Sequence, residues 1–198
     1  MNIVIASKNI GKIKEIKSST CSLSGIEWMT FRDFKDFPDV EENGSSFLEN
    51  ARLKAIAVSD YTGMITLSDD SGLEVDFLGG RPGVRSSRYA GDHATDKENR
   101  DKLIAELREV KNIYDRTARF VCSMVMRDPK KGTIFETRGV CSGHIGFKEE
   151  GTGGFGYDCI FIPSGYKKSM AQLDLNEKNN ISHRGKAIEA VCKFIVNF

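Results

Sequence analysis

The sequence predicts an α/β fold in which helices flank a twisted mixed sheet and form two lobes. A short apolar segment at 2–6 leads through a loop into a helix, which is typical of open α/β sheets. Farther along the chain, helix-capping patterns alternate with extended segments. Two long extended segments within 118–146 are joined by the turn sequence Asp-Pro-Lys-Lys-Gly. They predict a β-hairpin that extends the sheet between the two lobes.

The expected elements follow one another without a linker. Sequences of the form S-x-x-E at 46–49 and T-x-x-E at 95–98 are capping boxes, which mark helix N-termini. In chain order we expect a strand at 2–6, helices at about 12–20 and 46–59, strands at 64–67 and 73–77, a helix at about 95–110, the hairpin, a short strand at 160–162 and a final helix capped by Ser182. Because no repeat or Pro/Gly/Ser-rich tract interrupts this order, we expect a single domain over residues 1–198.

The composition argues against several classes of protein. The net charge of +1 lacks the basic surplus that is typical of nucleic-acid-binding domains. No apolar run approaches the roughly 18 residues of a membrane span, and the N-terminal segment reads as a short strand rather than a signal peptide. The five cysteines contain no C-x-x-C pair and indicate reduced thiols. We therefore expect a cytoplasmic protein that binds neither nucleic acid nor membranes.

The loop after the first strand has the chemistry of a phosphate-binding loop. It consists of Ser7, Lys8, Asn9, Ile10, Gly11 and Lys12. Backbone N–H groups at the start of the following helix can bind an anion, and the two lysines can neutralise it. The loop is not a Walker A motif, which needs glycine where Ala6 stands and serine or threonine where Ile13 stands. The alternative is a tight turn with two solvated lysines.

Two pairs of acidic residues are candidates for metal binding and proton transfer. Asp69 and Asp70 follow a predicted strand, at the position where α/β proteins build their sites. Adjacent side chains of an extended backbone point in opposite directions, so one aspartate can reach a cleft while the other caps the turn. Glu41 and Glu42 precede a capped helix, and one glutamate with one aspartate would be a normal complement for Mg²⁺. The alternative for the glutamates is a solvated pair near a helix N-terminus.

A glycine-rich segment and a basic segment in the last quarter of the chain could bind a nucleoside. Glycines let the backbone approach a ligand, while Phe155 or Tyr157 could stack on a base and Asp158 could accept a hydrogen bond. The alternative is a glycine turn whose aromatic residues belong to the core. His183 and Arg184 stand at a helix entrance and could donate to the keto oxygens of a purine, with a structural histidine as the alternative.

Taken together and in order, these segments resemble the inosine triphosphate pyrophosphatase family, the house-cleaning purine nucleoside triphosphate pyrophosphatases. The resemblance rests on Ser-Lys-Asn-Ile-Gly-Lys at 7–12, Ser-Phe-Leu-Glu-Asn-Ala at 46–51, Ser-Asp-Asp-Ser-Gly at 68–72 with Gly-Gly-Arg-Pro-Gly at 79–83, Gly-Gly-Phe-Gly-Tyr-Asp at 153–158 and Ser-His-Arg-Gly at 182–185. Each segment alone is unspecific, but their common order over nearly the whole chain is specific.

The resemblance implies a Mg²⁺-dependent nucleoside triphosphate diphosphatase. Such a pyrophosphohydrolase would convert the deaminated purine nucleotides ITP, dITP and XTP to nucleoside monophosphate and pyrophosphate, which removes them from the nucleotide pool. The resemblance also implies that the single domain is catalytic, that the α/β structure is elongated, and that the protein is a homodimer.

Carried over by position, the resemblance assigns roles to individual residues. Asp70 would be the catalytic proton acceptor and, with Glu41, a Mg²⁺ ligand. For Asp69 the resemblance gives no role, and the opposite directions of neighbouring strand side chains indicate a mainly structural or supporting one. The substrate-binding residues would be Ser7, Lys8, Asn9, Ile10, Gly11, Lys12, Lys54, Ser71, Phe155, Gly156, Tyr157, Asp158, Lys178, His183 and Arg184. Cys159 is a departure, because many members have proline after the aspartate.

Two other functions stay open on the sequence alone. One is a related pyrophosphatase for modified pyrimidine nucleotides. The other is a non-catalytic nucleotide- or RNA-binding module, which the near-neutral charge disfavours. The sequence also does not separate water attack on the α phosphorus from attack on the β phosphorus.

Overall fold

The computed structural model describes all residues from Met1 to Phe198. The chain forms two compact units, each assembled from separate stretches of sequence. Unit 1 comprises Met1–Asp70, Cys122–Gly139 and His183–Phe198, and unit 2 comprises Ser71–Val121 and Val140–Ser182. Neither unit is continuous in sequence, because the long central strands contribute residues to both. The single catalytic domain over residues 1–198 stays a prediction.

The sheet is mixed, which confirms the predicted α/β fold class. Its strand order is β2-β1-β3-β4-β5-β6. The strands are β1 (Asn2–Ile5), β2 (Glu27–Met29), β3 (Ile65–Val75), β4 (Thr117–Asp128), β5 (Gly132–Ile145) and β6 (Phe161–Pro163). β1 pairs in parallel with β2 and β3, whereas β5 and β6 are antiparallel. The predicted hairpin is present as β4 and β5.

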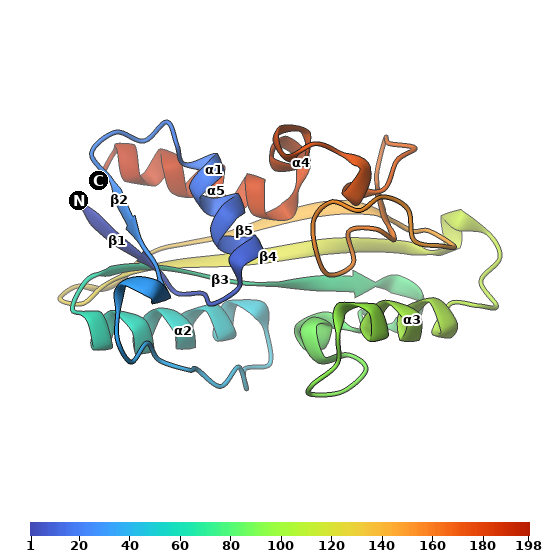
Figure 1. The fold of residues 1–198 in the computed structure, drawn as a ribbon, viewed down its shortest axis with the longest axis horizontal. Helices are drawn as coiled ribbons and strands as arrows, with labels where there is room; N and C mark the ends of the chain where they lie inside the picture. The colour runs from blue at the N-terminus through green and yellow to red at the C-terminus, as the bar shows by residue number, and fades with distance from the viewer. The chain divides into compact units, whose positions relative to one another are not determined.

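Unit 1 packs helices on both faces of its strands. The helices are α1 (Ile10–Ser19), α2 (Phe47–Thr62) and α5 (His183–Val196). Figure 1 shows α1 and α5 on one face and α2 on the other. The first face buries Ile16 and Val191 with alternate residues of β4, and the second face buries Ala55 against Val125. Because both faces of these strands are covered, β3 and β4 are buried along most of their length.

Unit 2 holds α3 (Asp96–Glu106) and the short α4 (Leu175–Ile181). Thr95 and Glu98 form the capping box that the sequence predicts at the start of α3. Asp174 and Glu177 form another capping box, at the start of α4. This helix was not predicted from the sequence. The core of unit 2 contains fully buried leucines from β3 and α3 together with aromatic residues from β4 and β6. No helix in either unit is long and apolar enough to span a membrane.

The acidic pair lies inside a strand rather than at the end of one, which corrects the predicted strands at 64–67 and 73–77. A single strand, β3, continues through the pair to Val75. Gly72 has no positive φ, so the backbone does not turn there. The Ser68 hydroxyl donates to the carbonyl of Ala51 at 2.6 Å and fastens this polar stretch to α2. Cations on both sides of the strand then balance the two buried carboxylates, as described below.

Candidate active site

Asp69 and Asp70 point to opposite faces of β3, as the alternation of side chains along a strand requires. The carboxylate of Asp69 contacts Lys12 of α1 and Arg184 of α5. The carboxylate of Asp70 contacts Asn50 and Lys54, both of which lie on α2. The two neighbouring carboxylates therefore belong to two separate clusters within unit 1.

The Asp69 cluster is a buried ion-pair network. Lys12 Nζ lies 3.1 Å from Asp69 Oδ2, and Arg184 Nη2 lies 3.2 Å from the same oxygen. Arg184 also pairs with Glu15 of α1 at 2.5 Å. Burial alone would raise the pKa of Asp69, but Lys12 and Arg184 outweigh burial and hold that pKa well below its usual range. Asp69 is therefore charged, and its ion pairs with Lys12 and Arg184 connect β3 to α1 and α5.

The carboxylate of Asp70 has weaker cationic partners than the carboxylate of Asp69. Lys54 Nζ lies 3.4 Å from Asp70 Oδ1 and 2.6 Å from Glu42 Oε1. Burial raises the pKa of Asp70, and the cations of Lys54 and Lys12 offset this effect only in part. Burial also acts against the charged form of Lys54, but the surrounding carboxylates outweigh it and raise the pKa of this amine. Asp70 is therefore a stronger base than an exposed aspartate.

The structure brings Glu42, rather than the predicted Glu41, into the Asp70 cluster. Glu41 is exposed, and no contact joins it to Asp70 or Lys54, whereas Glu42 is half-buried against Lys54. Between the carboxylates of Glu42 and Asp70 lies the ammonium of Lys54, so this position already attracts a cation. Two carboxylates are a normal protein contribution to a Mg²⁺ site whose other ligands are waters and phosphate oxygens. The donor set therefore fits Mg²⁺.

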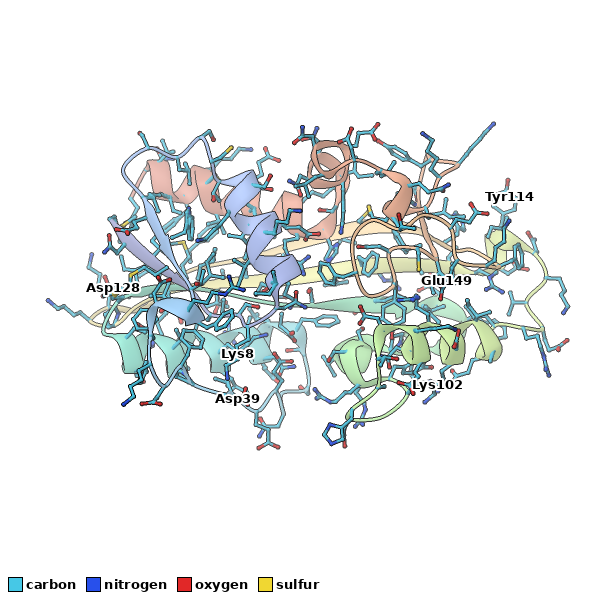
Figure 2. All side chains as sticks on the ribbon, viewed as in Figure 1. Lys8, Asp39, Lys102, Tyr114, Asp128 and Glu149 are labelled. Atoms are coloured by element: carbon cyan, nitrogen blue, oxygen red, sulfur yellow. The ribbon has the colours of Figure 1, made fainter.

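The predicted phosphate loop leads into α1 with its N-terminus open to solvent. Asn9 caps the helix by accepting from the Lys12 N–H at 3.1 Å, and Ser7 accepts from the Asn9 N–H at 3.2 Å. The first N–H groups of a helix have no partner within it and can bind an anion. Figure 2 shows Lys8 beside Asp39, and their charged atoms lie 3.3 Å apart in an exposed pair. Lys12 is instead fixed by Asp69.

The glycine-rich segment of unit 2 folds around a buried ion pair. Asp158 accepts from the Phe155 N–H at 2.9 Å and from Lys178 Nζ at 2.7 Å. Gly154 has a φ of +72°, and a Cβ there would lie 2.0 Å from Asp158 Oδ2, so only glycine fits. Lys178 Nζ also lies 5.1 Å from the centre of the Phe155 ring. Asp158 and Lys178 therefore hold the segment in shape.

The two aromatic residues of this segment differ in accessibility. Tyr157 is buried in the core, and its hydroxyl donates to the carbonyl of Ser86 at 2.8 Å. Phe155 is half-buried and is the better candidate for stacking on a base. Gly156, which separates the two aromatic residues in sequence, is fixed through its backbone. Its N–H donates to Asp96 and its carbonyl accepts from Arg100.

The remaining predicted residues are Ser71 on β3 and, at the start of α5, His183 and Arg184. Ser71 follows Asp70 on β3 and is half-buried. His183 and Arg184 are both buried, at 5% and 2% exposure, and Arg184 belongs to the Asp69 cluster. A Cβ on Gly139 of β5 would lie 1.9 Å from the His183 carbonyl, so glycine is required where the strand meets α5. The predicted purine contact of Arg184 thus competes with its ion pairs to Asp69 and Glu15.

Two residues of the clusters, Glu15 and Asn50, were not among the candidate site residues predicted from the sequence. Both are buried polar residues on helices, at 4% and 0% exposure. A polar residue on the apolar face of a predicted helix is a detectable signal, because such residues are rarely buried without a partner. Asn50 lies between Phe47 and Lys54 on the inner face of α2, so its position could have been noticed.

Comparisons with known proteins agree with the fold. A family model described as the Ham1 family matches residues 3–194. A relative from Oceanobacillus iheyensis, named dITP/XTP pyrophosphatase, is 45% identical over 194 residues, which cover 98% of this chain and 97% of the relative. A HAM1 protein from Coxiella burnetii has a solved structure with 38% identity and a TM-score of 0.89, and the match covers 100% of both chains. The Staphylococcus aureus Ham1 protein has 40% identity and a TM-score of 0.86, over 100% of this chain and 99% of that one.

Proposed function

The chain belongs to the Ham1 family, and we propose that it is a pyrophosphatase for deaminated purine nucleoside triphosphates. Its substrates are dITP, XTP and ITP, and its products are the nucleoside monophosphate and pyrophosphate. The name dITP/XTP pyrophosphatase, borne by relatives that match over nearly their whole length, supports this substrate class. The observation that carries the reaction type is the Asp70 cluster, in which a basic carboxylate and a lysine lie in the same unit as an exposed helix N-terminus.

The residues of unit 1 divide the chemistry among them. The loop from Ser7 to Lys12 binds the triphosphate through backbone N–H groups and lysine side chains. Lys12 and Lys54 offset the negative charge on the departing pyrophosphate. Asp70 accepts the proton of the attacking water, a role that its raised pKa favours. Asp70, together with Glu42 or Glu41, would hold Mg²⁺, which would supply neutralisation of phosphate charge and activation of water.

Selection for deaminated purines follows from the hydrogen bonds at position 6 of the base. Hypoxanthine and xanthine present a keto oxygen there, which accepts from donors such as His183 or backbone N–H groups. Adenine presents an amino group, so two donors would face each other. A site built around one hydrogen bond can reject the mismatched analogue by roughly 10⁴-fold.

The physiological setting belongs to the same proposal. An enzyme that cleans the nucleotide pool acts where that pool is used, so we place it in the cytoplasm, and we propose a homodimer. Light scattering of the purified protein would measure twice the mass of the 22.0 kDa chain if the homodimer forms. A monomer at micromolar concentration would remove that part of the proposal.

A product assay on a panel of nucleotides tests the proposed function. We expect rapid pyrophosphate release from dITP, XTP and ITP and little from ATP, GTP or dUTP, all in the presence of Mg²⁺. Phosphorus NMR should show a monophosphate and pyrophosphate as the products. Rapid turnover of modified pyrimidine nucleotides with little turnover of dITP and XTP would favour the pyrimidine alternative. Binding without turnover would favour the non-catalytic alternative.

A further inference from the structure

Asn50 is a fully buried polar side chain on the inner face of α2, at 0% exposure. It lies one turn before Lys54 on the same helix. A buried side-chain amide is costly unless its donors and its acceptor are used. The contacts of this amide therefore indicate what it does.

The two ends of the Asn50 amide contact two different parts of unit 1. Its oxygen accepts from the Gly44 N–H at 2.8 Å, and its nitrogen donates to Asp70 Oδ2 at 3.1 Å. An amide N–H can only donate, so the end of Asn50 that faces Gly44 must be the oxygen. The NH₂ group is thereby directed at the carboxylate of Asp70. Neither a carboxylate nor an apolar side chain of the same size could make both contacts.

The chain before α2 is packed closely against this amide. A Cβ on Gly44 would lie 2.7 Å from Asn50 Oδ1 and 2.8 Å from Glu49 Cβ, so glycine is required at this position. The N–H and hydroxyl of Ser45 both donate to Glu49, at 2.7 and 2.8 Å. The segment that carries Glu41 and Glu42 is thus fastened to the first turn of α2 immediately after the two glutamates.

Lys54 completes the arrangement from the next turn of the helix. Asn50 holds Asp70 Oδ2, and Lys54 contacts Asp70 Oδ1 and Glu42. Two residues of one rigid helix therefore determine where the Asp70 carboxylate and the acidic segment lie relative to each other. Asn50 and Lys54 thus hold the carboxylates that would supply oxygen ligands to a small cation.

We propose that Asn50 is a positioning residue, which fixes Asp70 and the segment from Glu41 to Gly44 so that both can bind one divalent cation. This inference rests on the proposed function only for its consequence in catalysis. Asn50 itself touches neither the substrate nor the cation. Removing a group that orients a ligand of this kind lowers metal affinity by about 10- to 100-fold.

Mn²⁺ titration followed by electron paramagnetic resonance tests the proposal without any substrate. We expect Asn50→Leu and Asn50→Asp to weaken Mn²⁺ binding by about 10- to 100-fold, because the first lacks both hydrogen bonds and the second places a like charge against Asp70. Gly44→Ala keeps Asn50 but displaces its oxygen, and it should weaken binding in the same direction. It also provides the test if the Asn50 variants do not fold.

Ser59→Ala is the matched control. Ser59 is a second fully buried polar residue of α2, and its hydroxyl donates to the carbonyl of Met64 at 3.2 Å, outside the Asp70 cluster. Its loss should reduce stability but leave Mn²⁺ affinity and the Mg²⁺ concentration for half-maximal pyrophosphate release unchanged. For folded Asn50→Leu, that Mg²⁺ concentration should rise by the same factor as the loss of Mn²⁺ affinity.

Two results would overturn the proposal. One is a folded Asn50→Leu protein with wild-type Mn²⁺ affinity. The other is a wild-type protein that binds no Mn²⁺. If the wild type binds Mn²⁺ but releases no pyrophosphate from dITP or XTP, the proposed function fails, while the Mn²⁺ titration still decides the role of Asn50.

Discussion

Asp69 and Asp70 are neighbours in sequence, yet they lie in regions of opposite character. On the α1 and α5 side of β3, Asp69 is surrounded by Lys12 and Arg184, and its pKa is lowered. On the α2 side, the carboxylate of Asp70 contacts the amide of Asn50 and a single lysine, Lys54, which lies farther away than the cations of Asp69 do. The pKa of Asp70 is raised. A carboxylate with close cationic partners holds elements together, whereas one with weaker partners keeps the capacity to bind a metal or a proton. The difference between the clusters supports the proposal that Asp69 stabilises the fold and that Asp70 takes part in the chemistry.

The largest expected effect on stability comes from breaking the Asp69 cluster. In Asp69→Asn, the carboxylate that pairs with both Lys12 and Arg184 is lost while their charges remain. Removing one partner of a buried ion pair costs about 3–5 kcal/mol of unfolding free energy. Chemical denaturation of the variant and the wild type measures this loss. An unchanged unfolding free energy would show that the cluster does not hold α1, β3 and α5 together.

The next effect separates the two glutamates on the Asp70 side. Glu42→Gln should lower kcat/KM by about 10- to 100-fold, because Glu42 lies beside Lys54 and would share the proposed Mg²⁺ with Asp70. Glu41→Gln is the comparison variant and should change kcat/KM less, since Glu41 is exposed and contacts neither Asp70 nor Lys54. Steady-state kinetics with dITP at several Mg²⁺ concentrations give both values. The opposite ranking would restore Glu41 as the metal ligand that the sequence predicts.

The smallest effect concerns a thiol behind the Asp69 cluster. Burial, reinforced by the charge of Asp69, raises the pKa of Cys122 to about 12, whereas Cys21 is exposed. Only the thiolate reacts with alkylating reagents, so Cys122 should stay unlabelled in the folded protein at pH 8 while Cys21 is labelled. On unfolding, the pKa of Cys122 returns to about 8.5 and labelling should follow. Mass spectrometry of peptides after iodoacetamide treatment measures the difference, and rapid native labelling of Cys122 would contradict this account of its burial.

Local patterns allowed much of the fold to be predicted from the sequence. The S-x-x-E and T-x-x-E patterns place the starts of α2 and α3 correctly, although only α3 has the full capping box, because Glu49 of α2 accepts from Ser45 instead of Ser46. The turn at 128–132 identifies the hairpin. β2 was missed because three residues are too few to show an alternating pattern. β3 was divided in two because Ser-Asp-Asp-Ser-Gly has the composition of a turn. Pairing of the aspartates with cations from separate helices overrides that local preference, and no local pattern contains such information.

The candidate site was predictable where its chemistry is local. The opposite directions of Asp69 and Asp70 follow from the alternation of a strand, and the phosphate loop follows from the order strand, loop and helix. The role of Glu15 was not predictable, because its partner Arg184 is 169 positions away. Which of the two glutamates contacts Lys54 depends on how the segment before α2 packs, which one sequence does not reveal.

The decisive measurement is the rate of pyrophosphate release by Asp70→Asn, compared with that of Asp69→Asn at equal concentrations of folded protein. We expect Asp70→Asn to lose about 10³-fold or more of the wild-type rate with dITP. Its unfolding free energy should stay close to that of the wild type. Asp69→Asn should show the reverse pattern, with most of its loss in stability. An Asp70→Asn protein that keeps most of the wild-type rate would contradict the assignment of the chemistry to Asp70.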